Sequence, residues 1–197
     1  MKMICLDLEG VLIPEIWIEF AKKTGHNEFL RTTRDEPDYD KLMGERIELL
    51  RKYNLRLKDI QNVIDTMPLL DGASRFLSAL RDKAQVTILS DTFSEFAYPF
   101  MKKLDFPSIF CNSLTTDNDG FVVKHNMRLQ NGKKKAIDAF RTLNFETFAS
   151  GDSYNDLEMI KNADDGALFM PPSNIVKENP NINAFYNYDD LLKYIFR

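Results

Sequence analysis

Residues 4–13 read ICLDLEGVLI, and this stretch places two carboxylates, Asp7 and Glu9, in a segment otherwise suited to a buried strand. Burying an unpaired carboxylate is costly in free energy, even after the surrounding structure relaxes. We therefore expect these two side chains at the end of a strand, in ion pairs, or on a metal ion.

The composition is typical of one globular core, alone or with a small insertion. The chain has 197 residues, of which 44% are hydrophobic, and a formal net charge of -4. Its only basic run, residues 133–135, is typical of a solvated helix start, so no nucleic-acid partner is expected. No apolar run approaches roughly 18 residues, which argues against a membrane span and a signal peptide.

The two cysteines, Cys5 and Cys111, have neither CxxC nor metal-site spacing. We expect buried or free thiols, as found in a reducing cytoplasm. The sequence therefore predicts a cytoplasmic protein without membrane or nucleic-acid partners. It does not decide the oligomeric state, and a homodimer is compatible with it.

Short apolar runs alternate with helical patterns along most of the chain. The runs predict buried strands over residues 3–9, 86–90, 145–150 and 166–170. The helical patterns cover residues 72–83, 94–104, 133–143, 154–163 and 188–196, and Asp119-Gly120 predicts a β-hairpin within residues 110–125. This alternation predicts an α/β fold with a doubly wound, Rossmann-like parallel sheet.

Residues 15–66 interrupt this alternation, because they are helical throughout except for a polar loop near residues 32–38. Pro14 precedes this segment and Pro68 follows it. A crossover between parallel strands needs only about a dozen residues. We therefore interpret residues 15–68 as a helical cap inserted into a core made of residues 1–14 and 69–197.

Each predicted strand is followed by polar residues, and the carboxyl ends of parallel strands share one edge of a sheet. These segments are Asp7–Gly10, Ser90-Asp91-Thr92 and Gly151–Asp156, and Lys133 begins the helix before the third of them. Several carboxylates in one site need a cation at neutral pH, and oxygen ligands favour Mg²⁺.

Asp7 is then placed to attack the phosphorus of a bound phosphate and form an aspartyl phosphate. Glu9 points to the other side of a regular strand, but a bend at Gly10 would bring it over the site as general acid and base.

Four segments together resemble the motifs of the haloacid dehalogenase (HAD) phosphohydrolases. Asp-Leu-Glu-Gly-Val resembles the first motif, whose usual form is Asp-x-Asp, while Ser90, Lys133 and Gly-Asp-Ser-Tyr-Asn-Asp match the second, third and fourth. DLEGVLIPEIW, TTRDEPDYD, ILSDTF and GDSYND are also similar to the bacterial bifunctional phosphoserine phosphatase/homoserine phosphotransferases. The resemblance implies a HAD-like fold with a small type-one cap and a role in serine and threonine biosynthesis.

The resemblance also implies roles for individual residues. Asp7 would be the nucleophile and Glu9 the acid and base. Asp7, the backbone carbonyl of Glu9 and Asp152 would bind Mg²⁺, with Asp156 on a metal-bound water. A further set, Ser90, Asp91, Thr92, Lys133 and Asn155, would contact phosphate, although the role of Asp91 is left open. Helix capping or an ordinary strand end is the alternative for Asp7, Ser90, Asn155 and Asp156.

Arg46 lies in the middle of an apolar helical face formed by residues 39–53. A substrate carboxylate would pair with the charge of Arg46. Alternatively, the guanidinium would reach solvent at the edge of the apolar face, or form an ion pair with a glutamate of the cap. The resemblance favours the carboxylate, and implies that Glu15 binds the substrate ammonium and that Tyr39 shields the substrate. Arg128 would contact the substrate or close the site.

These groups specify O-phosphoserine as substrate and homoserine as a second acceptor. A phosphatase for another small phosphate, a phosphate-binding protein without activity, and a phospho-accepting receiver domain are the alternatives. A receiver domain needs neither Glu9 nor the cap.

Overall fold

The computed structural model describes residues 1–33, 35–36 and 38–197. In this part of the chain, seven strands form one sheet in the order β4-β3-β2-β1-β5-β6-β7. Their bounds are β1 (Lys2–Leu6), β2 (Gln85–Phe93), β3 (Ser108–Thr116), β4 (Val122–Asn126), β5 (Glu146–Gly151), β6 (Asp165–Phe169) and β7 (Asn183–Phe185). All neighbouring pairs are parallel except β3 and β4. The predicted doubly wound sheet is confirmed.

Helices follow the strands as the alternation predicted. They are α1 (Ile16–Thr24), η1 (Asn27–Leu30), α2 (Tyr39–Lys52), α3 (Leu57–Thr66), α4 (Ala73–Arg81), α5 (Ser94–Lys103), α6 (Gly132–Thr142), η2 (Tyr154–Asp156), α7 (Leu157–Asn162), α8 (Ser173–Glu178) and α9 (Tyr188–Ile195). None of the described helices is both long and apolar enough to cross a membrane.

Strand β1 separates two hydrophobic clusters, one on each face of the sheet. Ile4 and Leu6 belong to the cluster shared with α4, α5 and α9, while Met3 and Cys5 belong to the cluster shared with α6 and α7. Alternate side chains of a strand point to opposite faces, so a run that is apolar at every position must be covered on both sides. This explains the uninterrupted apolar sequence before Asp7.

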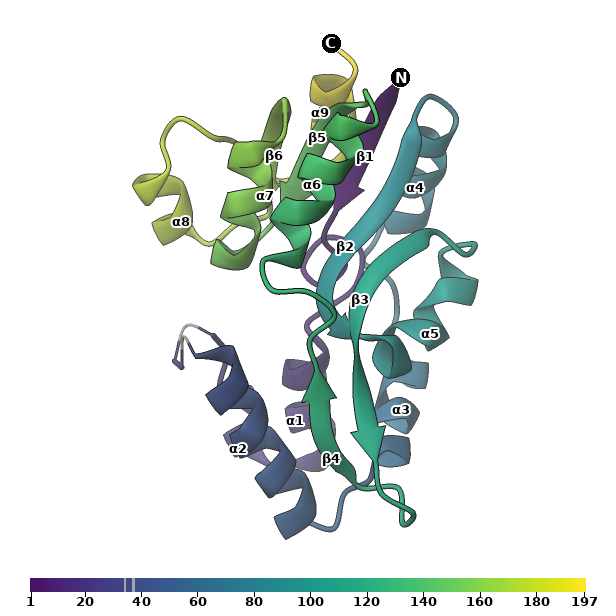
Figure 1. Ribbon diagram of the computed structural model, residues 1–197, viewed down its shortest axis with the longest axis vertical. Coiled ribbons are helices and arrows are strands. Elements are labelled where there is room, and N and C mark those ends of the chain that lie inside the picture. Colours follow the sequence, from purple (N-terminus) through teal and green to yellow (C-terminus); the bar gives the residue numbers. More distant parts are fainter. Residues whose placement is uncertain (34, 37) are drawn as a thin grey trace.

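Four helices, α1, η1, α2 and α3, gather beyond the carboxyl ends of the strands (Figure 1). We call them the cap helices. The side chains of Trp17, Phe20 and Phe29 pack with core residues such as Phe96 of α5 in the larger cluster. Apolar packing therefore joins the cap helices to the core, and the cavity described below lies between the two.

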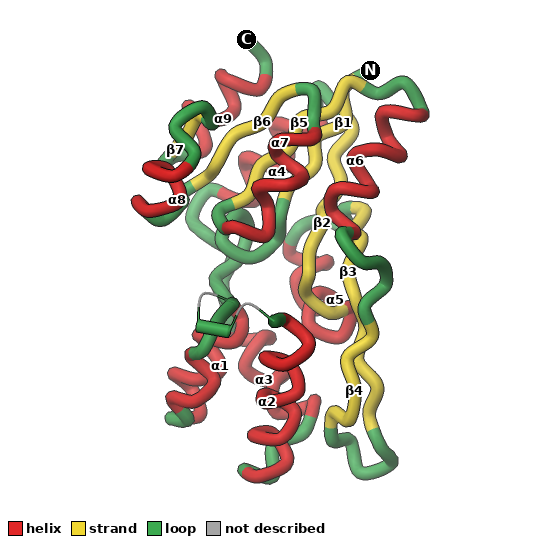
Figure 2. The backbone as a smooth tube through the Cα atoms, turned by 60° about the vertical axis from the view of Figure 1, so that its left-hand side comes forward, coloured by secondary structure: helices red, strands yellow, loops and turns green. Residues whose placement is uncertain are grey.

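The hairpin β3–β4 extends from the sheet along the cap helices (Figure 2). The backbone N–H of Leu57 donates to the carbonyl of Gly120 over 3.0 Å, and Arg51 Nη2 lies 2.7 Å from Asp117 Oδ2. The guanidinium of Arg51 also lies 4.2 Å above the ring of Phe121. The hairpin therefore joins the cap helices to the sheet a second time, in addition to the apolar packing. The contacts are made between residues that are far apart in the sequence.

Several predicted boundaries were wrong. The first strand ends at Leu6 rather than residue 9, because the backbone N–H of Leu12 donates to the carbonyl of Leu8 and closes a turn. The predicted β-hairpin is present at one edge of the sheet, where β4 pairs with β3 and the first half of β3 pairs with β2. The sequence reading also missed the short elements α8 and β7. Both cysteines are free thiols, as predicted.

Candidate active site

The turn after β1 brings the first carboxylates to the sheet edge. Gly10 has a φ of 74°, a backbone conformation that glycine adopts readily. A Cβ at Gly10 would lie 2.4 Å from Cγ of Asp152, so a side chain there would displace that carboxylate. The bend that the sequence predicted at Gly10 is therefore present, and it makes room for Asp152.

Lys133, at the start of α6, is the cation of this edge. Its Nζ lies 2.8 Å from Asp156 Oδ1, 3.2 Å from Asp7 Oδ1 and 3.5 Å from Asp91 Oδ2. Burial by itself would lower the pKa of Lys133, but Asp156, Asp7 and Asp91 outweigh it and raise the pKa well above its usual value. Lys133 therefore stays charged and faces the carboxylate of Asp7 directly.

Burial raises the pKa of Asp7 well above its usual value, and the positive charge of Lys133 opposes that shift. Asp156, Asp152 and Asp91 raise the pKa of Asp7 further by repulsion. An excess of negative charge at this edge therefore favours a cation there.

Asp156 is fully buried and organises the loop between β5 and η2. One of its carboxylate oxygens accepts hydrogen bonds from the N–H of Asp152 (3.1 Å), the N–H of Ser153 (3.0 Å) and Oγ of Ser153 (3.0 Å). Gly151 is needed for this, since a Cβ there would lie 2.1 Å from Asp156 Cγ.

Carboxylate oxygens of Asp7, Asp152 and Asp156 all lie within 4.8 Å of one another. A set made only of oxygen donors suits a hard divalent cation such as Mg²⁺. The carboxylate of Glu9 lies outside this set. The residues thus fit a metal, and Asp156, predicted for a metal-bound water, belongs to the same set as Asp7 and Asp152.

Glu9 turns its side chain toward the cap helices. Its Oε2 accepts a hydrogen bond of 2.8 Å from the N–H of Ile16, the first residue of α1. Burial, followed by repulsion from Glu15, raises the pKa of Glu9 to about 8. At neutral pH this carboxyl group therefore carries a proton that it can donate, as a general acid must.

The second half of β2 forms a second wall. Ser90 and Thr92 are buried, and the N–H of Thr92 donates to Ser90 Oγ over 3.3 Å. The carbonyl of Asp91 accepts hydrogen bonds from the Tyr39 hydroxyl (3.2 Å) and from Asn112 Nδ2 (3.0 Å). The Tyr39 contact joins the first turn of α2 to the phosphate-binding segment that the sequence predicted.

Arg46 is buried on the cap side and points inward rather than to solvent. Its Nη2 donates to the carbonyl of Arg31 over 2.8 Å, and its Nε is buried without a partner among the described residues. None of the ion pairs in the described ranges includes Arg46. Burial lowers the pKa of Arg46 to about 10, so it remains a cation at neutral pH.

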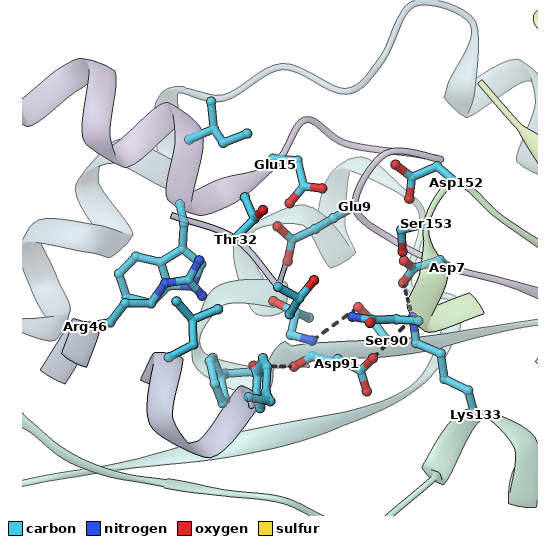
Figure 3. A pocket seen from close by; sticks show the side chains of 18 of the residues that line it. Asp7, Glu9, Glu15, Thr32, Arg46, Ser90, Asp91, Lys133, Asp152 and Ser153 are labelled. Atoms are coloured by element: carbon cyan, nitrogen blue, oxygen red, sulfur yellow. Dashed lines mark hydrogen bonds and ion pairs between the residues drawn. The ribbon is translucent and has the colours of Figure 1, made fainter. Parts of the chain in front are cut away.

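Both sides open into one cavity of about 360 Å³ (Figure 3). In this view Arg46 lies across the cavity from Lys133, with Glu9 and Glu15 between them. Twelve of the thirteen residues predicted for the site are accounted for here. Eleven line the cavity, namely Asp7, Glu9, Glu15, Tyr39, Arg46, Ser90, Asp91, Thr92, Lys133, Asp152 and Asn155, and Asp156 lies behind them.

The sequence of this chain matches the haloacid dehalogenase-like hydrolase family over residues 1–164. This chain belongs to that family. It is 47% identical to the phosphoserine phosphatase of Pseudomonas syringae over 98% of this chain and 81% of that protein. It is also 47% identical to the phosphoserine phosphatase ThrH of Pseudomonas aeruginosa, over 97% of this chain and 93% of that protein.

Solved structures share the fold of this HAD-like hydrolase. A phosphoserine phosphatase in a phospho-aspartyl intermediate analogue form superposes with a TM-score of 0.81 at 21% identity, covering 98% of both chains. An apo phosphoserine phosphatase superposes with a TM-score of 0.80 at 21% identity and the same coverage.

Arg128 does not line the main cavity of this hydrolase. It is exposed, its guanidinium lies 4.9 Å from the ring centre of Phe110, and it borders a small neighbouring cavity behind Ser90 and Lys133. That Arg128 contacts the substrate or closes the site therefore stays a prediction.

The sequence reading missed several lining residues, including Trp17, Thr32, Thr33, Ser153 and Met170. Ser153 could have been found from the fourth motif, and the two threonines from the quoted TTRDEPDYD segment. Arg34 and Pro37 of that segment lie outside the described residues. Trp17 could have been found as the last residue of the quoted DLEGVLIPEIW segment. Nothing local in the sequence marks Met170, because the packing of distant elements brings it to the cavity.

Proposed function

We propose that this HAD-like hydrolase is a Mg²⁺-dependent phosphoserine phosphatase that also transfers the phosphoryl group of phosphoserine to homoserine. The observation that carries the proposal is Arg46, a buried cation without an ion pair in the described chain, in the same cavity as Asp7 and Lys133. A buried guanidinium of this kind is stabilised by a carboxylate ligand. The names of the two Pseudomonas relatives support the same substrate.

We propose residues 15–68 as the cap and residues 1–14 and 69–197 as the catalytic core. The cap would then supply Arg46, Glu15 and Tyr39, and the core would supply the phosphate chemistry. Glu15 lies at the start of α1 and lines the cavity, where its carboxylate can accept from the substrate ammonium. Tyr39 covers the side of the cavity above Asp91.

In the first step a carboxylate oxygen of Asp7 attacks phosphorus, forming an O–P bond as the bond from phosphorus to the seryl oxygen breaks. Glu9 donates its proton to that oxygen, and serine leaves. Lys133 stabilises the negative charge on the phosphoryl group and on Asp7. A bound Mg²⁺ held by Asp7, Asp152 and the carbonyl of Glu9 would neutralise phosphate charge.

In the second step Glu9, now a carboxylate, takes the proton of an incoming water or alcohol. The oxygen of that molecule attacks phosphorus, the bond to Asp7 breaks, and both Asp7 and Glu9 return to their starting forms. Homoserine carries the same charged head as serine and one more methylene. Since one methylene changes binding by only about 1–3 kcal/mol, homoserine is a competent acceptor.

The proposal is tested by measuring phosphate release from O-phospho-L-serine with Mg²⁺, with and without homoserine. We expect phosphate release in both reactions and O-phosphohomoserine in the second. Release without the transfer product would leave a plain phosphatase. Cleavage of an aryl phosphate but not of phosphoserine would contradict the assigned roles of Arg46 and Glu15 and leave the chemistry of Asp7 in place.

A further inference from the structure

We propose that Trp17 is a positioning residue that makes the site selective for phosphomonoesters carrying a carboxylate. It does so by fixing the orientation of Arg46 and its distance from the phosphate site. This inference rests on the proposed function, since it gives Arg46 a carboxylate to bind.

The indole of Trp17 covers one face of the Arg46 guanidinium, whose Cζ lies 4.6 Å from the ring centre. A guanidinium stacked on an aromatic face is held by cation–π attraction, which strengthens when the pair is removed from water. Both side chains are at least nine-tenths buried. The ring also blocks approach from that face, which favours an anion that binds in the plane of the N–H donors of Arg46.

The donors of Arg46 are used unequally, which leaves hydrogen-bonding capacity for such an anion. Nη2 donates to the carbonyl of Arg31, and Nη1 lies 3.7 Å from the sulfur of Met43, a weak acceptor. Nε has no partner among the residues that the structure describes. The ring and the Arg31 carbonyl together fix the plane of the group and leave Nε for a ligand in that plane.

Trp17 is itself held by aromatic rings from both parts of the molecule. Phe29 of η1 stacks on it at 5.7 Å between ring centres, and Phe20 of α1 meets it edge-on at 6.0 Å. Phe96 of α5, a helix that packs on the sheet, meets it edge-on at 5.6 Å. The indole is therefore fixed relative to the core as well as to the cap helices.

The backbone connects this ring to the catalytic side as well. Trp17 follows Ile16, whose N–H donates to Glu9. The ring beneath Arg46 and the N–H group that binds the proposed general acid, Glu9, therefore belong to neighbouring residues. We infer that Trp17 sets the separation between the carboxylate and phosphoryl ends of the substrate.

A core tryptophan with no further role is the alternative, and the choice of substrate separates the two. O-phosphoethanolamine is O-phospho-L-serine without its carboxylate. If Trp17 acts through Arg46, replacing it affects only the ester that uses Arg46. If Trp17 is only structural, both esters are affected alike.

The experiment measures kcat and KM for both esters with the unchanged protein and with W17L, W17F and F20L. We expect W17L to raise KM for phosphoserine about thirtyfold, the value of a desolvated cation–π contact, with little change for phosphoethanolamine. W17F keeps an aromatic face and should recover most of the loss. F20L removes a ring from the same cluster but keeps the indole under Arg46, so its selectivity should match that of the unchanged protein.

The outcomes separate this inference from the function on which it rests. Equal loss for both esters in W17L, or the same shift in selectivity in F20L, would overturn the role of Trp17 while leaving a phosphoserine enzyme. If the unchanged protein does not prefer phosphoserine to phosphoethanolamine, the carboxylate site is absent. The proposed function and this inference would then both fall.

Discussion

Lys133 and Arg46 are both buried cations of the same cavity, and their surroundings differ. Lys133 has carboxylate oxygens of Asp7, Asp91 and Asp156 within 3.5 Å. Arg46 has an aromatic ring, a carbonyl oxygen and a sulfur atom around it, and belongs to no ion pair in the described residues. The core side of the site therefore already surrounds its cation with carboxylates, while under the proposed function the cap side is completed by an anion from the ligand.

This difference assigns chemistry to one side and selectivity to the other. The paired charges at the strand ends hold Asp7 and Lys133 in place before any substrate arrives, and preorganised groups need no rearrangement during reaction. A buried cation without a partner gains more from an anionic ligand than one already neutralised. Changes on the core side should thus abolish turnover or destabilise the protein, and changes on the cap side should alter which ester is used.

The largest effect is expected from removing the nucleophile. D7N should lower phosphoserine turnover by at least about a thousandfold, because an amide cannot form the aspartyl phosphate. It should leave the cap side intact, so L-serine should still change the emission of Trp17, the single tryptophan of the chain. Phosphate release measures the loss of turnover, and a fluorescence titration with L-serine measures the retained binding. Retained turnover would contradict the role of Asp7.

Breaking the paired side should also cost stability. D156A removes a fully buried carboxylate that pairs with Lys133 and holds the loop of Asp152 and Ser153. Removing one partner of a buried ion pair is expected to lower the free energy of unfolding by about 3–5 kcal/mol. Urea unfolding at neutral pH measures this, and a change no larger than that of a surface substitution would contradict the assigned pairing.

The raised pKa of Glu9 makes the stability of the metal-free protein depend on pH. Because the pKa of Glu9 is about 8 in the folded protein against a usual 4.5, the folded state holds a proton that the unfolded state releases. The resulting stabilisation is complete below about pH 4.5 and is lost as the pH rises through about 8.

E9Q mimics the protonated carboxyl of Glu9 at every pH, so it serves as the reference for the pH dependence of stability that Glu9 causes. Relative to E9Q, the unchanged protein should become steadily less stable between these two pH values, as measured by urea unfolding in the presence of a chelator. A constant difference between the two proteins across this range would show that the pKa of Glu9 is not raised.

The smallest effect on stability is expected on the cap side. R46M breaks no ion pair among the described residues and removes a buried charge, while it loses the contacts with Trp17 and the Arg31 carbonyl. We therefore expect the free energy of unfolding to change by no more than about 1 kcal/mol in either direction. A loss as large as that of D156A would remove the distinction between the two sides.

The sequence was most informative where one strand or helix alone determines where a side chain points. Asp7 and Asp152 follow apolar strands, and Ser90 follows the apolar part of β2. Parallel pairing brings these segments together whatever the loops do. Arg46 was identified by its place on an apolar helical face. Both kinds of prediction depend on local periodicity and on one general property of parallel sheets.

The parts that could not be predicted depend on how separate elements pack. The ring of Trp17 meets Arg46 only because α1, α2 and α5 come together. The contact between Glu9 and Ile16 depends on the path of the turn between them, and the hairpin reaches the cap helices through pairs distant in sequence, such as Arg51 and Asp117. Tertiary packing of this kind leaves no periodic trace in the sequence.

The central claim, that the cap side is completed by a substrate carboxylate, is tested most directly by one ratio. That ratio is kcat/KM for O-phospho-L-serine divided by kcat/KM for O-phosphoethanolamine, measured with Mg²⁺ in the unchanged protein and in R46M. We predict that R46M lowers the ratio by about a hundredfold through loss of the phosphoserine reaction alone, the usual scale for a charged hydrogen-bonded pair. An unchanged ratio would contradict the account.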